Sequence, residues 1–240
     1  MYVIKFGGAI ITDKGKPYTP NLDNMRRISR SLMKLRGDVI LAHGAGSFGH
    51  TAVKEEGLRR DGFCFTRSVM EELNHIFIKE LLRSGLNVIS MQTSALFTCD
   101  GGRIKNFNST PIDFCLKNKI IPVVYGDVVF DEEKGWVVLS ADQIITFLAE
   151  RYDGEFIFVS DVKGLYTDDP KKKDAELIPF VNDVKKYLKC AKEVGDVSGG
   201  MLGKLKEIAS HSSNGWLLDL ENFERFCSGE EFEGTRFENR

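Results

Sequence analysis

Two glycine-containing turns near the start of the chain each follow a short apolar run and carry a basic side chain. The first is KFGGA at residues 5–9, with Lys14 shortly after it, and the second is HGAGSFGH at 43–50. Backbone N–H groups in such turns can approach an anion closely, and lysine or histidine adds positive charge. Neither turn has the spacing of a P-loop or of a dinucleotide-binding GxGxxG motif that opens a helix. The pattern indicates a phosphate site of another kind.

Two later segments have a similar composition. SDVKGLYTDDP at 160–170 follows another apolar run, and DVSGGMLGK at 196–204 leads through glycines into a short helical pattern that contains Lys204. A glycine turn before a helix can present N–H groups and the helix N-terminus to a phosphate, with the lysine as a point charge. Taken singly, each segment is equally readily a charged surface loop. Together with the first two turns they favour binding of a phosphorylated small molecule.

The elements that must position these segments alternate between two periodicities. Short β-branched apolar runs predict strands buried on both faces at 2–6, 39–42, 88–91, 120–125 and 156–160. Apolar residues at helical spacing predict amphipathic helices at 21–35, 69–82, 141–151 and 203–210. This alternation predicts a three-layer α/β/α sandwich with a mostly parallel central sheet. Ligands in such sheets bind beyond the carboxyl ends of the strands, where the glycine turns are expected.

Two segments interrupt the alternation. VVFDEEKGWVVL at 128–139 predicts a β-hairpin about a charged turn at 131–135, and TCDGGRIKNFN at 98–108 predicts a second hairpin or a loop. The chain has no internal repeat, low-complexity linker or clean boundary. We therefore expect a single domain over residues 1–240, with a soft division near residue 140.

The composition is that of an ordinary globular protein. Of the 240 residues, 42% are hydrophobic and 28% charged, and the formal net charge of -2 gives no support to nucleic-acid binding. The five cysteines are scattered and odd in number, which argues against a disulfide framework or a zinc site. The apolar N-terminus is too short and too interrupted for a signal peptide or membrane span. We expect a cytoplasmic protein without a membrane partner.

Five segments together carry a family resemblance. KFGGAIITDK, HGAGSFGH, SADQI at 140–144, SDVKGLYTDDP and DVSGGMLGK occur in the order seen in the amino acid kinase superfamily. The HGAGSFGH segment is similar to that of the isopentenyl phosphate kinases, enzymes of isoprenoid biosynthesis, with the fosfomycin kinases the nearest relatives. Its terminal His50 is the discriminating residue, since superfamily members that phosphorylate carboxylates, carbamate or UMP generally lack it. The residues from Asn214 to Thr235 also resemble the last strands of the family.

The resemblance implies roles for the matching positions. Lys5 and Lys204 would lie along the ATP phosphates, Lys14 would stabilise charge in the transition state, and His50 would bond an oxygen of the acceptor phosphate. These four form the implied catalytic set. The implied nucleotide-binding set is Lys5, Gly7, Gly8, Ala9, Gly46, Asp142, Asp161, Gly164, Tyr166, Asp169, Gly200 and Lys204. The implied acceptor-binding set is Gly44, Ala45, Gly49, His50, Phe65, Phe77 and Gly126.

The residue types agree with this chemistry. Phosphoryl transfer to a phosphate joins two anions, so the site must supply positive charge and positioning rather than a strong base. The resemblance implies ATP and Mg²⁺ as cofactors, isopentenyl phosphate as the small-molecule acceptor, and a homodimer. The acceptor would bind residues 1–140 and ATP residues 141–240. The sequence offers no paired carboxylates, no set of metal ligands and no Ser/His/Asp arrangement for the same pocket.

In the family, the prenyl tail of the acceptor enters an apolar pocket near the helix that follows the histidine motif. The apolar residues of that stretch here are Phe63, Phe65, Val69, Leu73, Ile76 and Phe77. Most are expected in the core, with Phe65 or Phe77 lining the tail pocket. We expect His43 to pack beneath the glycine turn, and His75 and His211 to be surface or satisfied histidines.

The chain departs from the family at several positions. Ala9 stands where serine is frequent, and Ala45 and Ala141 stand where glycine is usual. A Cβ at residue 45 requires a backbone with φ below zero. The stretch after His50 is shorter than in many relatives. Three hypotheses stay open: an isopentenyl phosphate kinase, a fosfomycin-type phosphonate kinase or other phosphate-monoester kinase, and a nucleotide-binding regulatory domain that has lost catalysis. The chain has all four implied catalytic residues, which a domain without catalysis has no reason to keep. The third hypothesis is therefore ranked last.

Overall fold

An eight-stranded sheet forms the centre of the molecule in the computed structural model, which describes residues 1–57, 59–193 and 200–238. The strand order is β12-β14-β13-β9-β1-β2-β6-β3, and every adjacent pair is parallel except β13 and β14. The strands are β1 (Tyr2–Phe6), β2 (Val39–His43), β3 (Val88–Ser90), β6 (Ile121–Tyr125), β9 (Glu155–Ser160), β12 (Phe180–Val181), β13 (Gly215–Asp219) and β14 (Thr235–Phe237). The prediction of a mostly parallel sheet is confirmed.

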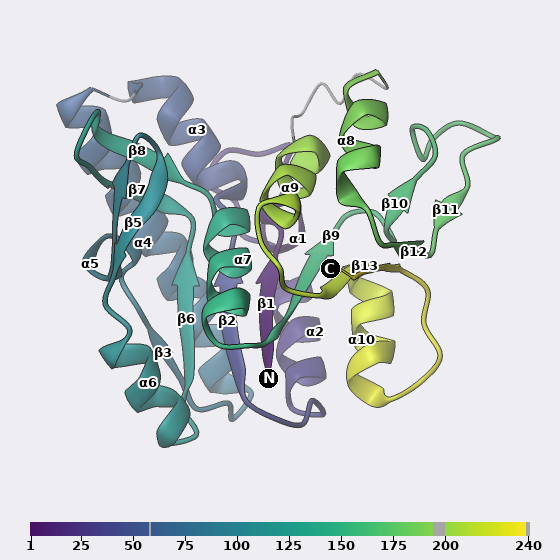
Figure 1. Cartoon of the computed structure of the whole chain (residues 1–240). Helices are drawn as coiled ribbons and strands as arrows, with labels where there is room; N and C mark the ends of the chain where they lie inside the picture. The colour runs from purple at the N-terminus through teal and green to yellow at the C-terminus, as the bar shows by residue number, and fades with distance from the viewer. Residues whose placement is uncertain (58, 194–199, 239–240) are drawn as a thin grey trace.

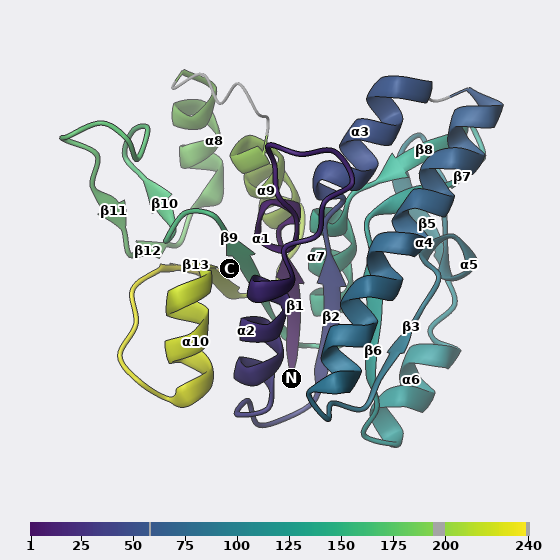
Figure 2. The same cartoon turned by 180° about the vertical axis from the view of Figure 1, so that it is seen from behind.

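Helices cover both faces of this sheet, as Figures 1 and 2 show from opposite sides. One apolar cluster lies under α1 (Gly8–Ile11), α2 (Leu22–Leu32), α3 (Gly46–Glu56), α4 (Arg60–Arg83) and α10 (Leu220–Ser228). The other lies under α6 (Thr110–Lys117), α7 (Ala141–Arg151), α8 (Val184–Glu193) and α9 (Gly200–Ala209). The fold is therefore the predicted three-layer α/β/α sandwich.

The central strand β1 shows how the sequence produces this arrangement. Side chains alternate between the faces of a strand, and here Val3 joins the cluster under α7 whereas Ile4 and Phe6 join the cluster under α2. All three are fully buried, which accounts for a run without polar alternation. Lys5 shares the face of Val3, so the same alternation directs a cation towards α7.

The predicted hairpin at 128–139 is present, and the segment 98–108, predicted as a hairpin or a loop, is a hairpin as well; both belong to a separate four-stranded sheet of order β5-β4-β7-β8. Its strands are β4 (Phe97–Asp100), β5 (Arg103–Phe107), β7 (Asp127–Asp131) and β8 (Gly135–Leu139). The β4–β5 and β7–β8 pairs are antiparallel. The short helix α5 (Thr93–Leu96) precedes β4, and β10 (Leu165–Tyr166) pairs with β11 (Leu177–Ile178) in a small antiparallel ribbon.

The helix predicted over 69–82 is longer than the prediction, because α4 begins at Arg60. The first turn of α4 contains Gly62, although glycine is a poor helix former. The structure gives a reason for the glycine: a Cβ on Gly62 would lie 2.3 Å from the Gly57 carbonyl oxygen, where the end of α3 approaches α4. Among the described residues, no helix combines the length and apolar character that crossing a bilayer requires.

Candidate active site

The carboxyl ends of β1, β2 and β9 meet at one edge of the sheet. Phe6 of β1 is in register with His43 of β2 and with Val159 of β9, and both pairs are parallel. The glycine turns after β1 and β2 and the Asp161 segment after β9 therefore converge at this edge, as predicted (Figure 1). The predicted DVSGGMLGK segment is described only from Gly200 onward; its residues 196–199 lie outside the described residues.

The two glycine turns pack backbone against backbone. A Cβ on Gly8 would lie 2.2 Å from the Gly46 nitrogen, and a Cβ on Gly44 would lie 2.8 Å from the Gly8 nitrogen. Gly46 also has φ of +50°, a conformation that favours glycine. Ala45 has φ of −75°, so its Cβ is tolerated in the way the sequence required. Helices α1 and α3 begin at these turns, and the first N–H groups of a helix have no acceptor within it.

Thr12 ties the two turns together. Its Oγ1 donates to the Gly8 carbonyl oxygen at 2.7 Å and accepts from the Ser47 N–H at 2.9 Å. The residue is fully enclosed at 1% exposure. Sequence reasoning assigned Thr12 no role, although its place inside the KFGGAIITDK motif was a usable signal. Thr12 therefore sets the spacing of the two glycine turns.

Asp142 lies between two lysines that come from distant parts of the chain. Lys5 Nζ of β1 lies 2.7 Å from Asp142 Oδ1, and Lys204 Nζ of α9 lies 3.5 Å from Asp142 Oδ2. Asp142 occupies the first turn of α7, whose N-cap Ser140 accepts from the Gln143 N–H at 3.1 Å. Lys204 also donates to the Gly200 carbonyl oxygen at 3.3 Å. Three residues that the sequence predicted for the nucleotide site are therefore brought together.

Burial and charge act in opposite directions on this group. Burial disfavours the ionised form of Asp142, but Lys5 and Lys204 outweigh it and hold the pKa of the carboxyl below its ordinary value. Burial lowers the pKa of the Lys5 ammonium, and the neighbouring Lys204 adds to this, while Asp142 opposes it. An ionised carboxylate with two ammonium groups leaves one positive charge, which suits a phosphate ligand.

Lys14 is paired with an aspartate that follows β9. Its Nζ donates to Asp161 Oδ2 at 2.7 Å, and Ser160 Oγ donates to Asp161 Oδ1 at 3.2 Å. Both members of the Lys14–Asp161 pair are exposed. The pair joins the loop after α1 to the end of β9, so Lys14 is held at the same edge as the glycine turns.

The two histidines of the HGAGSFGH segment have different environments. His50 is exposed on α3, four residues after Gly46. His43 is fully buried, with Nδ1 donating to the Gly44 carbonyl oxygen at 3.1 Å and its ring stacked on Tyr125. Burial lowers the pKa of His43 to about 4, so the ring is neutral at physiological pH. The structure therefore places His43 beneath the turn, as predicted, and leaves His50 accessible to a ligand.

The other predicted acceptor residues are placed as follows. Gly49 packs so closely that an added Cβ would lie 2.8 Å from Met70 Sδ, and the Gly126 N–H donates to the His43 carbonyl oxygen at 2.9 Å. Phe77 is fully buried between Phe6 and His43, whereas Phe65 is 43% exposed on α4. Of the two phenylalanines predicted to line a tail pocket, only Phe65 offers accessible surface in this structure.

The loop after β9 is anchored to the last strand of the sheet. Leu165 N–H donates to Thr235 Oγ1 at 2.7 Å, and a Cβ on Gly164 would lie 2.5 Å from the same oxygen. Tyr166 and Asp169 are half-buried, and Asp169 Oδ1 accepts from the Lys171 N–H at 3.0 Å. The glycine at 164 thus has a packing reason that is independent of nucleotide binding.

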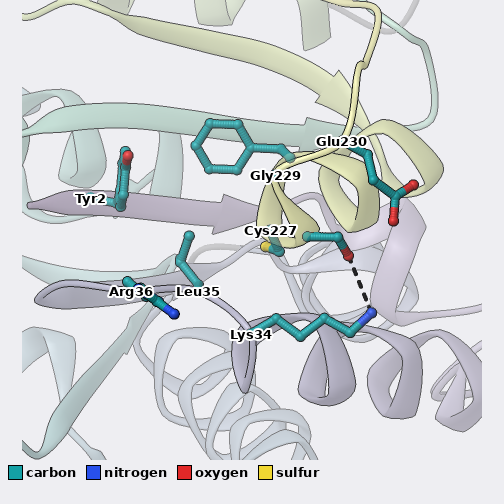
Figure 3. A pocket seen from close by; sticks show the side chains of 9 residues that line it. Tyr2, Lys34, Leu35, Arg36, Cys227, Gly229 and Glu230 are labelled. Atoms are coloured by element: carbon teal, nitrogen blue, oxygen red, sulfur yellow. Dashed lines mark hydrogen bonds between the residues drawn. The ribbon is translucent and has the colours of Figure 1, made fainter.

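An open cavity of about 640 Å³ lies between α2 and α10, at the opposite edge of the sheet. Figure 3 shows Tyr2, which begins β1, on one side of the cavity and Glu230 on the other, and Lys34 Nζ donates to Ser228 Oγ at 3.2 Å. None of the residues predicted for the phosphate site lines this cavity. The cavity is therefore separate from the edge where the glycine turns meet.

Comparisons with known proteins agree with this geometry. Residues 1–215 match the profile of the Amino acid kinase family. The chain is 33% identical to the isopentenyl phosphate kinase of Methanothermobacter thermautotrophicus over 98% of each chain, and 31% identical to that of Thermoplasma acidophilum over 89% of this chain and 88% of the relative.

Solved structures give the same result. An X-ray structure of isopentenyl phosphate kinase matches with a TM-score of 0.86 at 32% identity, covering 99% of both chains. The product complex of the Thermoplasma acidophilum isopentenyl phosphate kinase matches with a TM-score of 0.81 at 28% identity, again over 99% of both chains. An aspartate kinase from Synechocystis, at 15% identity and a TM-score of 0.74, shares the fold alone.

Proposed function

The chain belongs to the amino acid kinase family, within the isopentenyl phosphate kinases, and on that premise we propose that it transfers the γ-phosphoryl group of ATP to isopentenyl phosphate. The products are isopentenyl diphosphate and ADP. The bond from the γ-phosphorus to the bridging oxygen of ATP breaks, and a new bond joins that phosphorus to an oxygen of the acceptor phosphate. An ionised acceptor oxygen needs no base to remove a proton.

The observation that carries this proposal is the Lys5–Asp142–Lys204 group beside the two packed glycine turns. The two lysines would supply positive charge along the ATP phosphates, and their ion pairs with Asp142 hold both ammonium groups in position. Preorganised donors of this kind stabilise the charge of the transferring group without reorganisation during the reaction. Lys14, held at the mouth by Asp161, would meet the transferring phosphoryl group from the other side.

The residues present fit ATP better than they fit a metal ion bound by protein side chains alone. A Cβ at Gly8 or Gly46 would collide with the neighbouring turn, so glycine at both positions lets the two backbones and their N–H groups come together, as a phosphate cradle requires. Mg²⁺ in kinases is held by substrate phosphates with one or two carboxylates, and here Asp142 is already engaged by two lysines. We therefore expect the nucleotide phosphates to provide most ligands of the Mg²⁺, which would neutralise part of their charge.

The acceptor phosphate would bind on the side of α3. His50 is accessible there and would donate to an acceptor oxygen, while the N–H groups at the Gly44–Gly46 turn would hold the transferring group. The tail of the acceptor would lie towards α4, where Phe65 is accessible. A phosphonate acceptor such as fosfomycin is not favoured, because the curated relatives that cover nearly the whole chain are named isopentenyl phosphate kinases.

An ADP-release assay with Mg-ATP tests the proposal. The purified chain is given isopentenyl phosphate, dimethylallyl phosphate, fosfomycin or no acceptor in parallel. We expect turnover with the prenyl phosphates at least about tenfold above the control without acceptor. Turnover with fosfomycin alone would assign a phosphonate kinase instead. ATP binding without turnover on any acceptor would refute the proposed activity.

Two further properties belong to this proposal. A cytoplasmic location is supported by the free thiols of Cys64, Cys99, Cys115 and Cys227. A homodimer is supported by apolar surface at the sheet edge, where Leu82 of α4 is 50% exposed and Ile89 of β3 is 44% exposed. Light scattering on the purified chain measures the oligomeric state, and a monomeric mass at micromolar concentration would contradict the dimer.

A further inference from the structure

Asp127 lies two residues beyond the carboxyl end of β6, next to the acceptor side of the candidate site. It follows Gly126, whose N–H donates to the His43 carbonyl oxygen at 2.9 Å. Tyr125 of β6 is in register with His43 of β2, and His43 leads directly into the Gly44–Gly46 turn. Asp127 thus starts β7 at the edge where the phosphate groups would meet. Sequence reasoning gave this aspartate no role.

The carboxylate of Asp127 is buried and incompletely paired. The residue is 3% exposed, and Oδ1 accepts from the Val128 N–H at 2.8 Å. Within the described part of the chain, Oδ2 is enclosed and has no hydrogen-bond partner. The Arg67 guanidinium of α4 is the cation beside it, with Nη1 3.7 Å from Oδ2, which is an ion-pair distance but too long for a hydrogen bond.

Arg67 is not available to Asp127 alone. Its guanidinium donates to Glu71 on the next turn of α4 and to Ser94 of α5. The Gln92 side-chain oxygen also accepts from Nη2 and Nη1 of Arg67, at 2.8 and 2.9 Å, when the amide is oriented so that its oxygen faces these donors. A cation shared in this way compensates a second carboxylate only in part.

The charged and titratable groups that face Asp127 are few. Arg67 and Glu71 come from α4, and Tyr125 comes from β6. Burial raises the pKa of the Tyr125 phenol, so the phenol stays neutral in the working range. One arginine and two carboxylates leave one negative charge when Asp127 is ionised and none when Asp127 carries a proton. Burial raises the pKa of Asp127 to about 7, so both states are populated near neutral pH.

We propose that Arg67 and Asp127 set the charge on the acceptor side of the site, so that a phosphorylated acceptor binds more tightly when Asp127 carries a proton. This inference rests on the proposed function, which supplies the anionic acceptor. Asp127 is a positioning residue in this scheme, since it acts on the acceptor through charge and through the Gly126 backbone rather than by contact.

The direction follows from linkage. An acceptor anion near an ionised carboxylate is repelled, so protonation of Asp127 favours binding, and binding in turn favours protonation. The acceptor KM should therefore rise as pH increases through about 7. ATP should respond less, because Lys5 and Lys204 compensate Asp142 on the opposite face of the sheet. The acceptor phosphate titrates by itself near pH ~6, so the informative quantity is the ratio between wild type and variant.

The first experiment measures the KM for isopentenyl phosphate from about pH 6 to about pH 8.5 in wild type and in Asp127→Asn. We expect the ratio of wild-type KM to variant KM to rise by about threefold to tenfold over this range, with a flat ratio for ATP. Asp131→Asn is the matched control, since Asp131 begins the turn at the far end of the same strand and the backbone N–H groups that it accepts from lower its pKa. Its ratio should not change with pH.

The second experiment measures the protons taken up when the acceptor binds. Isothermal titration of the wild-type chain with isopentenyl phosphate near pH ~7.5, in two buffers of different ionisation enthalpy, measures protons taken up on binding. We expect net uptake, and we expect less of it in Asp127→Asn. Two outcomes would overturn this inference and leave the kinase assignment intact. One is an acceptor KM that changes with pH in the same way in wild type and Asp127→Asn, both active; the other is equal proton uptake by the two proteins. Absence of turnover by the wild type would instead refute the proposed function.

Discussion

The Lys5 ammonium lies 2.7 Å from Oδ1 of Asp142 in a site where the two side chains are 7% and 15% exposed. Such a pair is costly to form and more costly to break, because removing one partner leaves the other buried without compensation. The geometry joins β1 to the start of α7 and, through Lys204, to α9. It therefore places two cations at a fixed separation before any nucleotide binds.

Asp142→Asn tests this arrangement. The variant leaves two ammonium groups uncompensated, so we expect its free energy of unfolding to fall by about 3–5 kcal/mol. ATP should raise the melting temperature more in the variant than in the wild type, because the phosphates supply the missing negative charge, while kcat falls about tenfold or more. Thermal unfolding with and without Mg-ATP measures the loss of stability and the ATP-induced shift, and steady-state kinetics measures kcat. Glu150→Gln in the same helix is the control, since Glu150 pairs at the surface with His211; equal ATP shifts in all three proteins would contradict the role of Asp142.

Lys14→Ala separates ground-state binding from transition-state stabilisation. If Lys14 meets the charge that develops during transfer, kcat should fall roughly 10²–10³-fold while the KM for ATP changes by less than about threefold. Steady-state kinetics at varied ATP gives both constants. Lys16→Ala, in the same loop with Asp13 as its partner, should remain near wild type. An equal loss in both constants would indicate a ground-state phosphate clamp.

His50→Ala should act on the acceptor alone. We expect kcat/KM for isopentenyl phosphate to fall about a hundredfold, with the ATP dissociation constant and the melting temperature nearly unchanged, because His50 is exposed on α3. His75→Ala provides a control from an exposed histidine of α4. Wild-type kcat/KM in the His50 variant would show that another group holds the acceptor phosphate.

Local patterns in the sequence were sufficient for the sheet and for the convergence of the glycine turns. The apolar residues among 2–6 fall on both faces of the strand, which predicted a strand buried on both faces, and the glycine turns beside Lys5 and His43 were predicted to lie at the carboxyl ends of the strands, where the structure places them. The hairpin at 128–139 followed from turn residues between two apolar runs. These features depend on neighbours in sequence, so one chain is enough to detect them.

Other features depend on contacts that sequence spacing does not contain. The close approach of Gly8 to Gly46 joins two turns 38 residues apart, and only coordinates reveal it. The prediction of a helix from Val69 missed the first turns of α4, where the approach of Gly57 requires the small Gly62. The partners of Arg67 come from α4, α5 and β7, so their charges could not be summed in advance.

Gly8→Ala should disrupt the packing of the two turns. Its Cβ would lie 2.2 Å from the Gly46 backbone nitrogen, and neither backbone can give way without moving Thr12. We expect a loss of about 1–3 kcal/mol in unfolding free energy and loss of activity. Gly203→Ala in α9 is the control for stability, since its Cβ would meet no atom within 4 Å. Because alanine is the better helix former, that variant should gain up to about 1 kcal/mol. Denaturant unfolding of the wild type and the two variants measures these changes. A Gly8→Ala variant as stable as the wild type would refute the close packing of the two turns.

The stability of Asp127→Asn should depend on pH in a direction fixed by its burial. The pKa of Asp127 is raised to about 7 in the folded chain, above the model-peptide value of 3.8, so the folded state binds more protons between these values. Wild-type stability from this group is complete at acid pH and is lost as pH rises through about 7. Asparagine does not titrate, so the variant should be more stable than the wild type by about 2–4 kcal/mol near pH ~8 and nearly equal to it near pH ~4. Denaturant unfolding across this range measures the difference.

Asp131→Asn is the control and should show a constant difference in stability from the wild type above pH ~5, because the pKa of Asp131 is lowered rather than raised. If the stability difference between Asp127→Asn and the wild type were also constant with pH, Arg67 would be keeping the Asp127 carboxylate ionised throughout this range.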